Sequence, residues 1–450
     1  MGSIFKAYDV RGIYPDQLDE DMAYKIGLAF QHIMAEEDVA GRQVVVSRDM
    51  RSHSEPLSEA LIRGLREGGL NVLDIGLATT PMNYFAVGHL EAAGGVQVTA
   101  SHNPARYNGL KFSRSDARPV SGDHGIPLLE ASVANGDLPK AEQMGTLEYG
   151  DIKEDYFTHV YAHLKHPLDA PRLKVVVDAA NGMGVLYGDF LQRLGIRLLP
   201  LYFELDGTFP NHEANPLKLE NLEDLSKMVL EEEADLGVSF DGDADRAAFV
   251  DEKGEPVGSD LSTALIAGEL LGREPGRHVV YDLRSSRAVA EYITECDGIP
   301  VRERVGHSFI KATLREKHGI FGGELAGHYY FRDNYHADCA VMAVVEMLNL
   351  IWRHDKPFSE IVEPLKRYAK SPEINFRVED KEGMMAELAE AYSDGDIDYL
   401  DGITVEYADW WFNVRPSNTE PYLRLVLEAS TELELDERRE ELEARLGEPA

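Results

Sequence analysis

The chain has 450 residues, and its 80 Asp and Glu against 45 Lys and Arg give a formal net charge of −35 at pH 7. The length predicts several domains with ample buried core. Such strong negative charge excludes nucleic acid as a partner and argues against anionic membranes. No stretch resembles a signal peptide or a membrane span, and Cys296 and Cys339 fit no metal or redox spacing. We therefore expect a soluble cytoplasmic protein.

The acidity also indicates the conditions in which the protein works. At about 1 M ionic strength the screening length is roughly 3 Å, so distant carboxylates act little on a binding cleft. An acidic surface with few lysines suits a salt-rich cytoplasm, and we expect a halophilic source.

Apolar strands followed by helical patterns recur along the chain. Leu57, Leu61 and Leu65 are spaced by four, which is typical of one face of a helix. Repeated strand-then-helix units predict α/β domains with substantial sheets. Three similar strands, each ending in a polar turn, are residues 44–49, 175–180 and 279–284.

The first candidate site follows a strand predicted at residues 94–98. Turn signals hold Ser101 in a loop after this strand, and Pro104 keeps Asn103 out of the helical region. Lys111 follows closely enough to place a cation near the serine hydroxyl. A serine beside a fixed cation suits phosphoryl transfer, where positioning and charge neutralisation do most of the work. An ordinary polar loop is the alternative.

A second site lies where a predicted buried strand, residues 235–240, runs into three aspartates. In an extended chain Asp241, Asp243 and Asp245 share one face, so their carboxylates converge. Their mutual repulsion requires a cation, and hard oxygen ligands with positions left for phosphate oxygens suit Mg²⁺. Arg246 comes next and can bind a phosphate through two hydrogen bonds.

Two other interpretations of this segment are weaker. A solvated acidic turn does not account for the apolar strand that precedes it. An EF-hand calcium loop has the matching Asp spacing and Glu252 at its twelfth position. It also needs Gly where Arg246 stands, and a helix where residues 247–250 predict a strand.

A glycine-rich loop, residues 321–328, carries a carboxylate and an imidazole. Glu324 and His328 can bind sugar hydroxyls and move protons near neutral pH.

The last candidate loop begins at Arg415, between strands predicted at residues 410–414 and 422–427. Residues 415–421 combine one guanidinium with two hydroxyls and an amide, a composition typical of a phosphate cradle. A capping turn before a strand is the alternative.

In their order and separation, these four segments resemble the alpha-D-phosphohexomutases, and most closely the phosphomannomutase/phosphoglucomutase branch. The likeness covers nearly the whole chain: it begins at residues 7–12, continues through residues 306–311 and ends with the Arg415 loop. The resemblance implies an α/β, multi-domain fold. Three related α/β domains with mixed sheets and a smaller C-terminal α+β domain would surround a central cleft.

The resemblance also implies a role for each matched residue. Ser101 would be the phosphoserine, and Mg²⁺ would be held by an oxygen of its phosphate together with Asp241, Asp243 and Asp245. Glu324 and His328 would contact sugar hydroxyls. The phosphate that is not reacting would be bound by Arg415, Ser417, Asn418 and Thr419. Other matched positions that line the cleft are Tyr8, Arg11, His102, Lys111, Arg246 and His307.

The implied reaction moves phosphate between O6 and O1 of mannose, and also of glucose in some members. A hexose 1,6-bisphosphate intermediate must turn end for end, so one phosphate rests in the cradle while the other reacts at Ser101. The metal, Lys111 and Arg246 would offset charge in the transition state. His328 and Lys111 are the two candidates for the group that handles the sugar hydroxyl proton.

One position departs from the family pattern. Ala326 stands where many members carry Ser, which removes a sugar contact worth about 1 kcal/mol and leaves the choice between mannose and glucose open. Phosphoglucosamine mutases usually carry Gly at the Asn418 position, so that activity is the second alternative. A non-catalytic sugar-phosphate-binding protein on the same fold is the third. Adjacent Ser101 and His102 cannot form the nucleophile–base bond of a serine hydrolase.

We place the domain boundaries near residues 145, 252 and 368. The Lys-Ser-Pro segment at residues 370–372 predicts a hinge, about which the last domain closes over bound sugar. We expect hexose phosphates as partners and a monomer or weak homodimer. The predicted domains are 1–145 with the phosphoserine loop, 146–252 with the metal loop, 253–368 with the sugar loop and 369–450 with the phosphate cradle.

Overall fold

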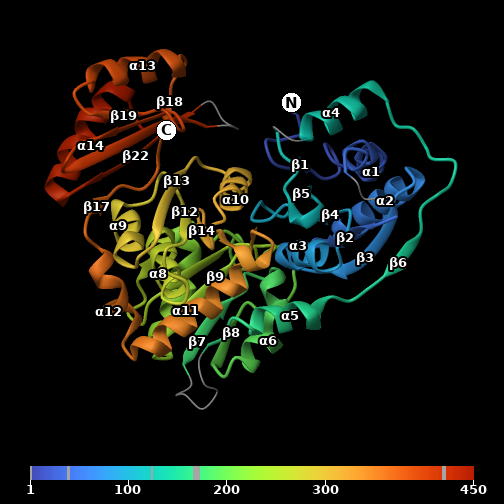
Figure 1. Cartoon of the computed structure of the whole chain (residues 1–450), viewed down its shortest axis with the longest axis horizontal. Helices are drawn as coiled ribbons and strands as arrows, with labels where there is room; N and C mark the ends of the chain where they lie inside the picture. The colour runs from blue at the N-terminus through green and yellow to red at the C-terminus, as the bar shows by residue number, and fades with distance from the viewer. Residues whose placement is uncertain (1–2, 38–40, 123–124, 166–172, 418–421) are drawn as a thin grey trace.

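The structure of the protein is a computed structural model that describes residues 3–37, 41–122, 125–165, 173–417 and 422–450. Within these residues the chain forms four sheets flanked by helices, one after another along the sequence (Figure 1). The first three sheets combine parallel strands with antiparallel ones, and the pairings of the fourth are antiparallel. This confirms the expected class of three related α/β domains with mixed sheets and a C-terminal α+β domain.

The first sheet has the strand order β1-β5-β4-β2-β3-β6. Every residue of β4 is buried, which agrees with its apolar sequence and its central place. The last strand, β6, follows the boundary expected near residue 145. The strands are β1 (Val10–Ile13), β2 (Gln43–Arg48), β3 (Asn71–Leu77), β4 (Gly94–Val98), β5 (Tyr107–Arg114) and β6 (Leu147–Tyr149). The helices are α1 (Glu20–Met34), α2 (Ser54–Glu67), α3 (Thr80–His89) and α4 (Ile126–Asn135).

The second and third sheets repeat one plan, in which parallel strands continue into an antiparallel hairpin. Their orders are β11-β10-β9-β7-β8 and β13-β12-β14-β15-β16. The second domain contains α5 (Lys153–Tyr161), β7 (Lys174–Asp178), α6 (Gly188–Arg193), β8 (Arg197–Leu201), α7 (Glu223–Glu231), β9 (Leu236–Phe240), β10 (Ala247–Val250) and β11 (Pro256–Val257). The third contains α8 (Ser259–Leu271), β12 (His278–Asp282), α9 (Arg287–Glu295), β13 (Ile299–Glu303), α10 (His307–Glu316), β14 (Phe321–Gly323), β15 (Tyr329–Phe331), β16 (Ala337–Asp338), α11 (Ala340–His354) and α12 (Phe358–Val362).

The fourth sheet has the order β17-β22-β21-β20-β19, and β18 also pairs with β22. Two helices pack on it. The elements are β17 (Ala369–Lys370), β18 (Ile374–Arg377), α13 (Lys381–Ala391), β19 (Asp396–Asp398), β20 (Ile403–Glu406), β21 (Trp410–Pro416), β22 (Tyr422–Ala429) and α14 (Glu432–Leu446).

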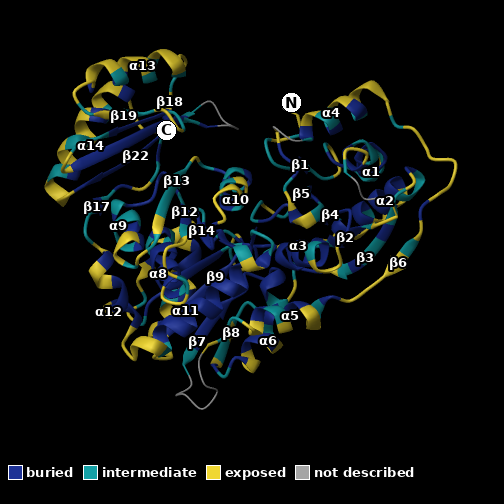
Figure 2. Ribbon diagram, in the orientation of Figure 1, coloured by how far each residue is buried: buried dark blue, intermediate teal, exposed yellow. Residues whose placement is uncertain are grey.

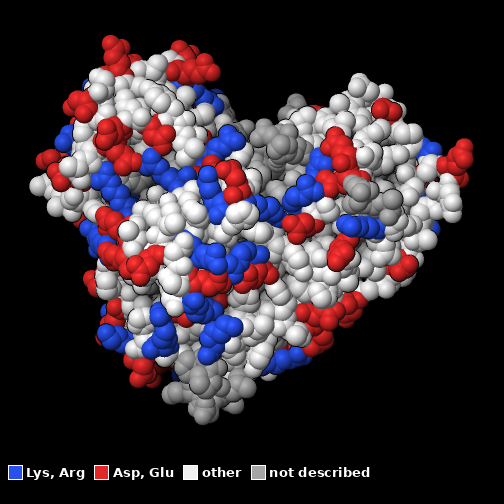
Figure 3. All heavy atoms as spheres, in the orientation of Figure 1, with Lys and Arg blue, Asp and Glu red and all other residues white. Residues whose placement is uncertain are grey.

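The domains share their hydrophobic cores to different extents. One cluster of buried side chains joins the second and third domains and reaches into the first, and it surrounds α11, which is almost entirely buried (Figure 2). The C-terminal domain has a core of its own. The surface is hollowed between the C-terminal domain and the N-terminal domain, with Lys and Arg on both sides of the hollow (Figure 3). Among the described residues, none of the helices combines the length and apolarity needed to span a membrane.

Candidate active site

Ser101 lies just beyond the carboxyl end of β4. Its φ of +49° is a left-handed conformation that residues other than glycine seldom adopt, so surrounding contacts must hold it. The side chain is buried, and its Oγ donates a hydrogen bond to Asp241 Oδ2 at 2.7 Å. The Ser101 amide donates to Thr99 Oγ1 at 2.9 Å. The predicted nucleophile therefore faces one of the predicted metal ligands.

Arg51 fixes this loop, although no sequence motif marks it. Its guanidinium donates to the backbone carbonyls of Ser101 at 2.8 Å, Asn103 at 2.6 Å and Pro104 at 2.9 Å. The Arg51 side chain is fully buried and pairs with Asp49 at 3.2 Å. A buried cation that is paired and donates to several carbonyls is a rigid clamp on the backbone.

The three aspartates converge, but not in the extended conformation expected. Residues 241–245 form a turn, in which Ala244 has a φ of +58°. The amides of Asp245 and Arg246 donate to Asp241 Oδ1 at 3.0 and 3.1 Å, and these bonds bend the chain back on itself. Asp241, Asp243 and Asp245 each offer an oxygen within 4.8 Å of the others. The turn, rather than strand alternation, brings the carboxylates together.

The charges of this cluster fit a divalent cation. Burial raises the pKa of the Asp241 carboxyl well above its usual range, and the charges of Asp245 and Asp243 raise it further. Asp243 Oδ1 and Asp245 Oδ1 are buried without a hydrogen-bond partner among the described residues. Buried carboxylate oxygens without partners, close to one another, are suitable ligands for a hard cation.

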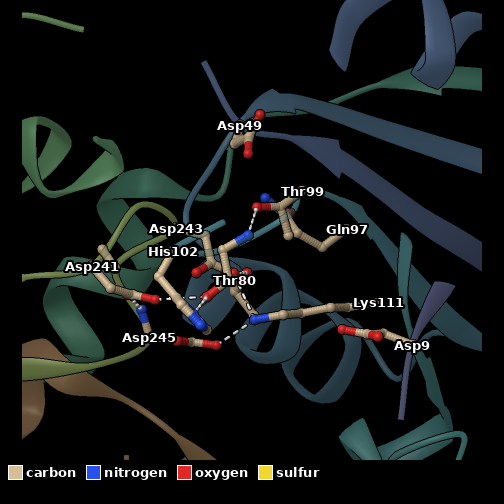
Figure 4. A network of polar contacts seen from close by, with 12 residues as sticks. Asp9, Asp49, Thr80, Gln97, Thr99, His102, Lys111, Asp241, Asp243 and Asp245 are labelled. Carbon is tan, nitrogen blue, oxygen red and sulfur yellow. Dashed lines mark hydrogen bonds and ion pairs between the residues drawn. The ribbon is translucent and has the colours of Figure 1, made fainter. Parts of the chain in front are cut away.

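Lys111 reaches the same aspartates from β5 (Figure 4). Its ammonium lies 2.7 Å from Asp243 Oδ2 and 2.5 Å from Asp245 Oδ2. Burial by itself lowers the pKa of Lys111, but the charges of Asp243 and Asp245 outweigh burial and hold it well above its ordinary value. Lys111 is therefore a fixed cation beside the aspartate cluster.

His328 borders the cluster on the side of the sugar loop. Its Nε2 accepts a hydrogen bond from Arg246 Nε at 2.9 Å. Its Nδ1 lies 3.6 Å from Asp338 Oδ2 and 3.8 Å from Asp245 Oδ1. Glu324, on the same loop, accepts from the amide of Gly306 at 3.1 Å and from the Tyr330 hydroxyl. The loop is thus tied both to the aspartate turn and to the start of α10.

The remaining predicted cleft residues lie in two places. Tyr8 and His307 meet edge to face, with ring centroids 5.0 Å apart. Arg11 is held by Asp9 at 2.6 Å and donates to Asn103 Oδ1 at 2.7 Å, beside the serine loop.

Both imidazoles of this group are held neutral. Burial lowers the pKa of His102 well below its ordinary value, and the Arg246 guanidinium lowers it further. Burial and the Lys311 ammonium likewise lower the pKa of His307 well below its ordinary value. His102 Nδ1 lies within hydrogen-bond distance of Ser101 Oγ, at 3.2 Å, so the prediction that these adjacent residues cannot form such a bond was wrong.

The predicted phosphate cradle lies in the C-terminal domain. Arg415 is buried on β21 and pairs with Glu373 at 2.7 Å. The Ser417 amide donates to the carbonyl of Tyr422 at 2.9 Å. Asn418 and Thr419 lie outside the described residues. Arg284 also reaches Glu373, at 3.3 Å.

Arg284 is a second residue that no motif marked. It follows β12, and it is clamped by Asp282, which also accepts from the Leu325 amide at 3.3 Å. The sugar loop and the cradle are therefore connected through one buried ion pair. One signal for Arg284 and Arg51 does exist in the sequence: Asp-x-Arg-Ser follows the strand in both the first and the third domain, at residues 49–52 and 282–285.

The chain matches known proteins along its whole length. Four family models, described as phosphoglucomutase/phosphomannomutase alpha/beta/alpha domains I, II and III and C-terminal domain, match residues 2–140, 154–254, 259–368 and 373–445. A relative named phosphohexose mutases, from Xanthomonas campestris pv. campestris, is 39% identical over 97% of each chain. A phosphomannomutase of Vibrio cholerae is 35% identical over 96% of this chain and 95% of its own.

A solved structure agrees with these sequence matches. It is a phosphoglucomutase/phosphomannomutase family protein from Burkholderia thailandensis, with a TM-score of 0.90 and 33% identity over 99% of this chain and 98% of that one. Fold and relatives together define an enzyme of the phosphohexomutase type, an intramolecular phosphotransferase. The chain belongs to the phosphoglucomutase/phosphomannomutase family, and the resemblance stated from its motifs is confirmed.

Proposed function

We propose that the protein is a phosphomannomutase that transfers phosphate between O6 and O1 of mannose through a phosphoserine at Ser101. The observation that carries this proposal is the 2.7 Å hydrogen bond between Ser101 Oγ and Asp241, in a buried cluster of three aspartates. A hydroxyl fixed beside potential metal ligands suits phosphoryl transfer. Hexose 1,6-bisphosphate is the intermediate and activator. Glucose is proposed as a second, poorer sugar.

In the first half-reaction the O–P bond at Ser101 breaks and one forms at the sugar hydroxyl; in the second, the O–P bond at the other position of the bisphosphate breaks and one forms again at Ser101 Oγ. In the first half-reaction His328 Nε2 takes the proton from the sugar hydroxyl once Arg246 leaves that nitrogen for the phosphate, and the proton passes to Ser101 Oγ as its bond to phosphorus breaks; the second half-reaction returns a proton from Ser101 Oγ to the sugar oxygen. Lys111 is assigned to phosphate oxygens, because its neighbours hold it protonated. Glu324 orients the sugar, and Arg415 with Ser417 binds the distal phosphate, as the matched family positions imply.

Mg²⁺ is the proposed cofactor, with Asp241, Asp243, Asp245 and the Ser101 phosphate as its ligands. When bound, it neutralises charge on the transferring phosphoryl group. We expect chelation with EDTA to abolish turnover of mannose 1-phosphate and added Mg²⁺ to restore it. Turnover that persists through exhaustive chelation would contradict the metal assignment.

Intact-mass analysis tests the phosphoserine directly. The purified protein is measured before and after incubation with glucose 1,6-bisphosphate, and we expect a gain of one phosphoryl group. Ser101→Ala should not gain it. A wild-type protein that never carries covalent phosphate would favour the alternative of a non-catalytic sugar-phosphate-binding protein.

A side-by-side assay tests the substrate. We expect turnover of mannose 1-phosphate to exceed that of glucose 1-phosphate, with none for glucosamine 1-phosphate. Turnover of glucosamine 1-phosphate would support the phosphoglucosamine mutase alternative instead. Analytical ultracentrifugation of the same purified protein measures its oligomeric state, and we expect a monomer or a weak homodimer.

A further inference from the structure

Glu373 lies where three arginines from two domains meet, beside the proposed phosphate cradle. Its carboxylate accepts hydrogen bonds from Arg415 Nη2 at 2.7 Å, Arg424 Nη1 at 3.1 Å and Arg284 Nη1 at 3.3 Å. Arg284 belongs to the third domain, whereas Arg415 and Arg424 belong to the fourth. Glu373 directly follows the predicted hinge, residues 370–372. One carboxylate therefore connects the cations of two domains.

The two strand arginines need an anion between them. Arg415 on β21 and Arg424 on β22 are direct partners in the register. Like charges directly opposite each other are destabilising. Glu373 bonds Arg415 through Oε2 and Arg424 through Oε1, so it separates the two cations. Burial raises the pKa of Glu373, but the guanidiniums of Arg284, Arg415 and Arg424 outweigh burial and leave it below its ordinary value.

Arg415 retains donor capacity beyond this pair. The residue is 4% exposed, and its Nε is buried without a hydrogen-bond partner in the part of the chain that the structure describes. A guanidinium carries five N–H donors, and a buried donor without an acceptor costs free energy. A phosphate offers more acceptor oxygens than a carboxylate and carries more negative charge. Phosphate therefore suits this group of arginines better than Glu373 does.

We propose that Glu373 is an exchangeable internal anion, which pairs with Arg284 and Arg415 until the phosphate of a sugar substrate takes its place. This inference rests on the proposed function, because it concerns the same cradle. A carboxylate that competes for the same guanidiniums lowers the affinity of the cradle for phosphate.

The exchange also suits an intermediate that must turn. The bisphosphate has to leave the cradle during each turnover, and its departure would leave Arg415 without the anion that pairs with it. Glu373 returns to Arg415 as the phosphate leaves, so release becomes an exchange of anions. The carboxylate thus weakens binding and speeds release together.

Titration calorimetry with inorganic phosphate tests the competition. We expect Glu373→Gln to bind phosphate about tenfold more tightly than the wild type, because the neutral amide neither competes for the arginines nor repels the anion. Adding Arg415→Ala to Glu373→Gln should remove this gain, which assigns the bound phosphate to the cradle.

Glu406→Gln is the matched control. Glu406 also lies between the third and fourth domains and pairs with Arg302 and Arg287, not with the cradle arginines. Glu406→Gln also removes one carboxylate from the interface between these domains. We expect the affinity of this variant for phosphate to equal that of the wild type.

Steady-state kinetics separate exchange from a structural role. With glucose 1,6-bisphosphate supplied, we expect both KM and kcat for mannose 1-phosphate to fall in Glu373→Gln, because tighter binding slows release. Loss of structure alone would not lower KM. Glu373→Asp, which keeps the charge on a shorter side chain, should show the same changes to a smaller extent, and it serves as the test if Glu373→Gln does not fold.

Two results would overturn the proposal: phosphate binding that is unchanged or weaker in the folded variant, or a gain that survives Arg415→Ala. Failure of the proposed function gives a different result. A wild-type protein without covalent phosphate at Ser101 refutes the phosphoserine mutase, whether or not Glu373→Gln binds phosphate more tightly.

Discussion

A single guanidinium holds the loop of the proposed nucleophile. Arg51 donates to the carbonyls of Ser101, Asn103 and Pro104, and Asp49 keeps its guanidinium charged and oriented. Ser101 has a positive φ, which costs of order 1–3 kcal/mol outside glycine. The clamp supplies the contacts that make this conformation stable. Arg51 therefore acts on the proposed nucleophile through the backbone.

Arg51→Lys should misplace the nucleophile. A lysine keeps the charge but cannot reach several carbonyls at once. Because small displacements of reacting groups are costly, we expect kcat to fall about 100-fold. Hydrogen exchange should also quicken over residues 99–107. Arg48→Lys is the control, because Arg48 pairs with the exposed Glu55, and this variant should retain activity. If Arg51→Lys is as active as Arg48→Lys, the proposed role of Arg51 in holding the loop is wrong.

Gly242→Ala should separate the serine loop from the aspartate turn. An added Cβ would stand 2.3 Å from the carbonyl oxygen of Ser101, so one of the two loops must move. Overpacking of this kind costs about 1–3 kcal/mol, and we expect most turnover to be lost. At Gly188 the nearest atom is 3.3 Å away, on Phe203, and Gly188→Ala should be mild in the same assay. Equal activity of both variants would rule out a tight contact between the loops.

At the scale of elements, two strands of the repeated domains end in the same way. After β2, Arg51 binds Asp49 and clamps the serine loop; after β12, Arg284 binds Asp282 and Glu373 beside the proposed phosphate cradle. In both cases the arginine amide also donates to the aspartate, at 3.0 and 2.8 Å. One local structure has thus been used twice, for two ends of the cleft.

The helix α11 depends on one buried acid. Glu346 interrupts its apolar face and accepts hydrogen bonds from His163 Nδ1 at 3.2 Å, Asn349 Nδ2 at 3.1 Å and Arg273. Arg273 and His163 join α11 to the segments that follow α8 and α5. Burial raises the pKa of Glu346, but the bond from His163 and the charge of Arg273 outweigh it and leave the pKa below its ordinary value of 4.5.

Glu346→Gln should therefore destabilise the protein in a pH-dependent way. We expect a loss of about 1–3 kcal/mol near neutral pH, because hydrogen bonds to a charged acceptor are the stronger ones. A lowered carboxyl pKa contributes stability that is complete above pH 4.5 and disappears as pH falls through the folded-state value. Denaturant unfolding of the wild type and Glu346→Gln at several pH values should show that their difference in free energy of unfolding shrinks below pH 4.5. A difference that stays constant with pH would contradict the stabilising role of the charged Glu346 carboxylate.

Much of this arrangement was predictable, for reasons that differ from residue to residue. β4 and β9 are largely apolar runs followed by polar turns, so the sequence predicts both the strands and the loops that carry Ser101 and Asp241. The convergence of the aspartates was right, but its reason was wrong, since backbone amides that bind Asp241 create the turn. Glu373 was not predictable, because Arg284 comes from a turn of the third domain and Arg415 and Arg424 come from strands of the fourth, which only folding brings together.

At the scale of the whole molecule, the C-terminal domain is attached differently from the others. Its core is separate, and the facing surfaces carry ion pairs, with Arg302 bound to Glu406 and Asp398 and Lys370 bound to Asp260. Such an interface is easier to open than a shared apolar core. This suits the proposed closure of the domain about its hinge.

Salt should stabilise the protein. Each exposed ion pair contributes about 0–1 kcal/mol, whereas a net charge of −35 repels itself over the whole surface. Screening of this repulsion outweighs the weakening of the pairs, so we expect Tm to rise by several degrees between about 0.1 and 2 M KCl, with the Debye length falling from about 10 Å to below 3 Å. Full stability and activity in dilute buffer would contradict the expectation of a halophilic source.

The hydrogen bond between Ser101 and Asp241 has a consequence for the order in which the proposed site is completed during protein synthesis. The two residues are 140 positions apart, so a ribosome that translates from the N-terminus exposes the serine well before the carboxylate that receives it. Arg415 emerges later still. The nascent first domain therefore carries Ser101 and Arg51 without the proposed metal ligands, and the proposed site is complete only when synthesis is nearly finished.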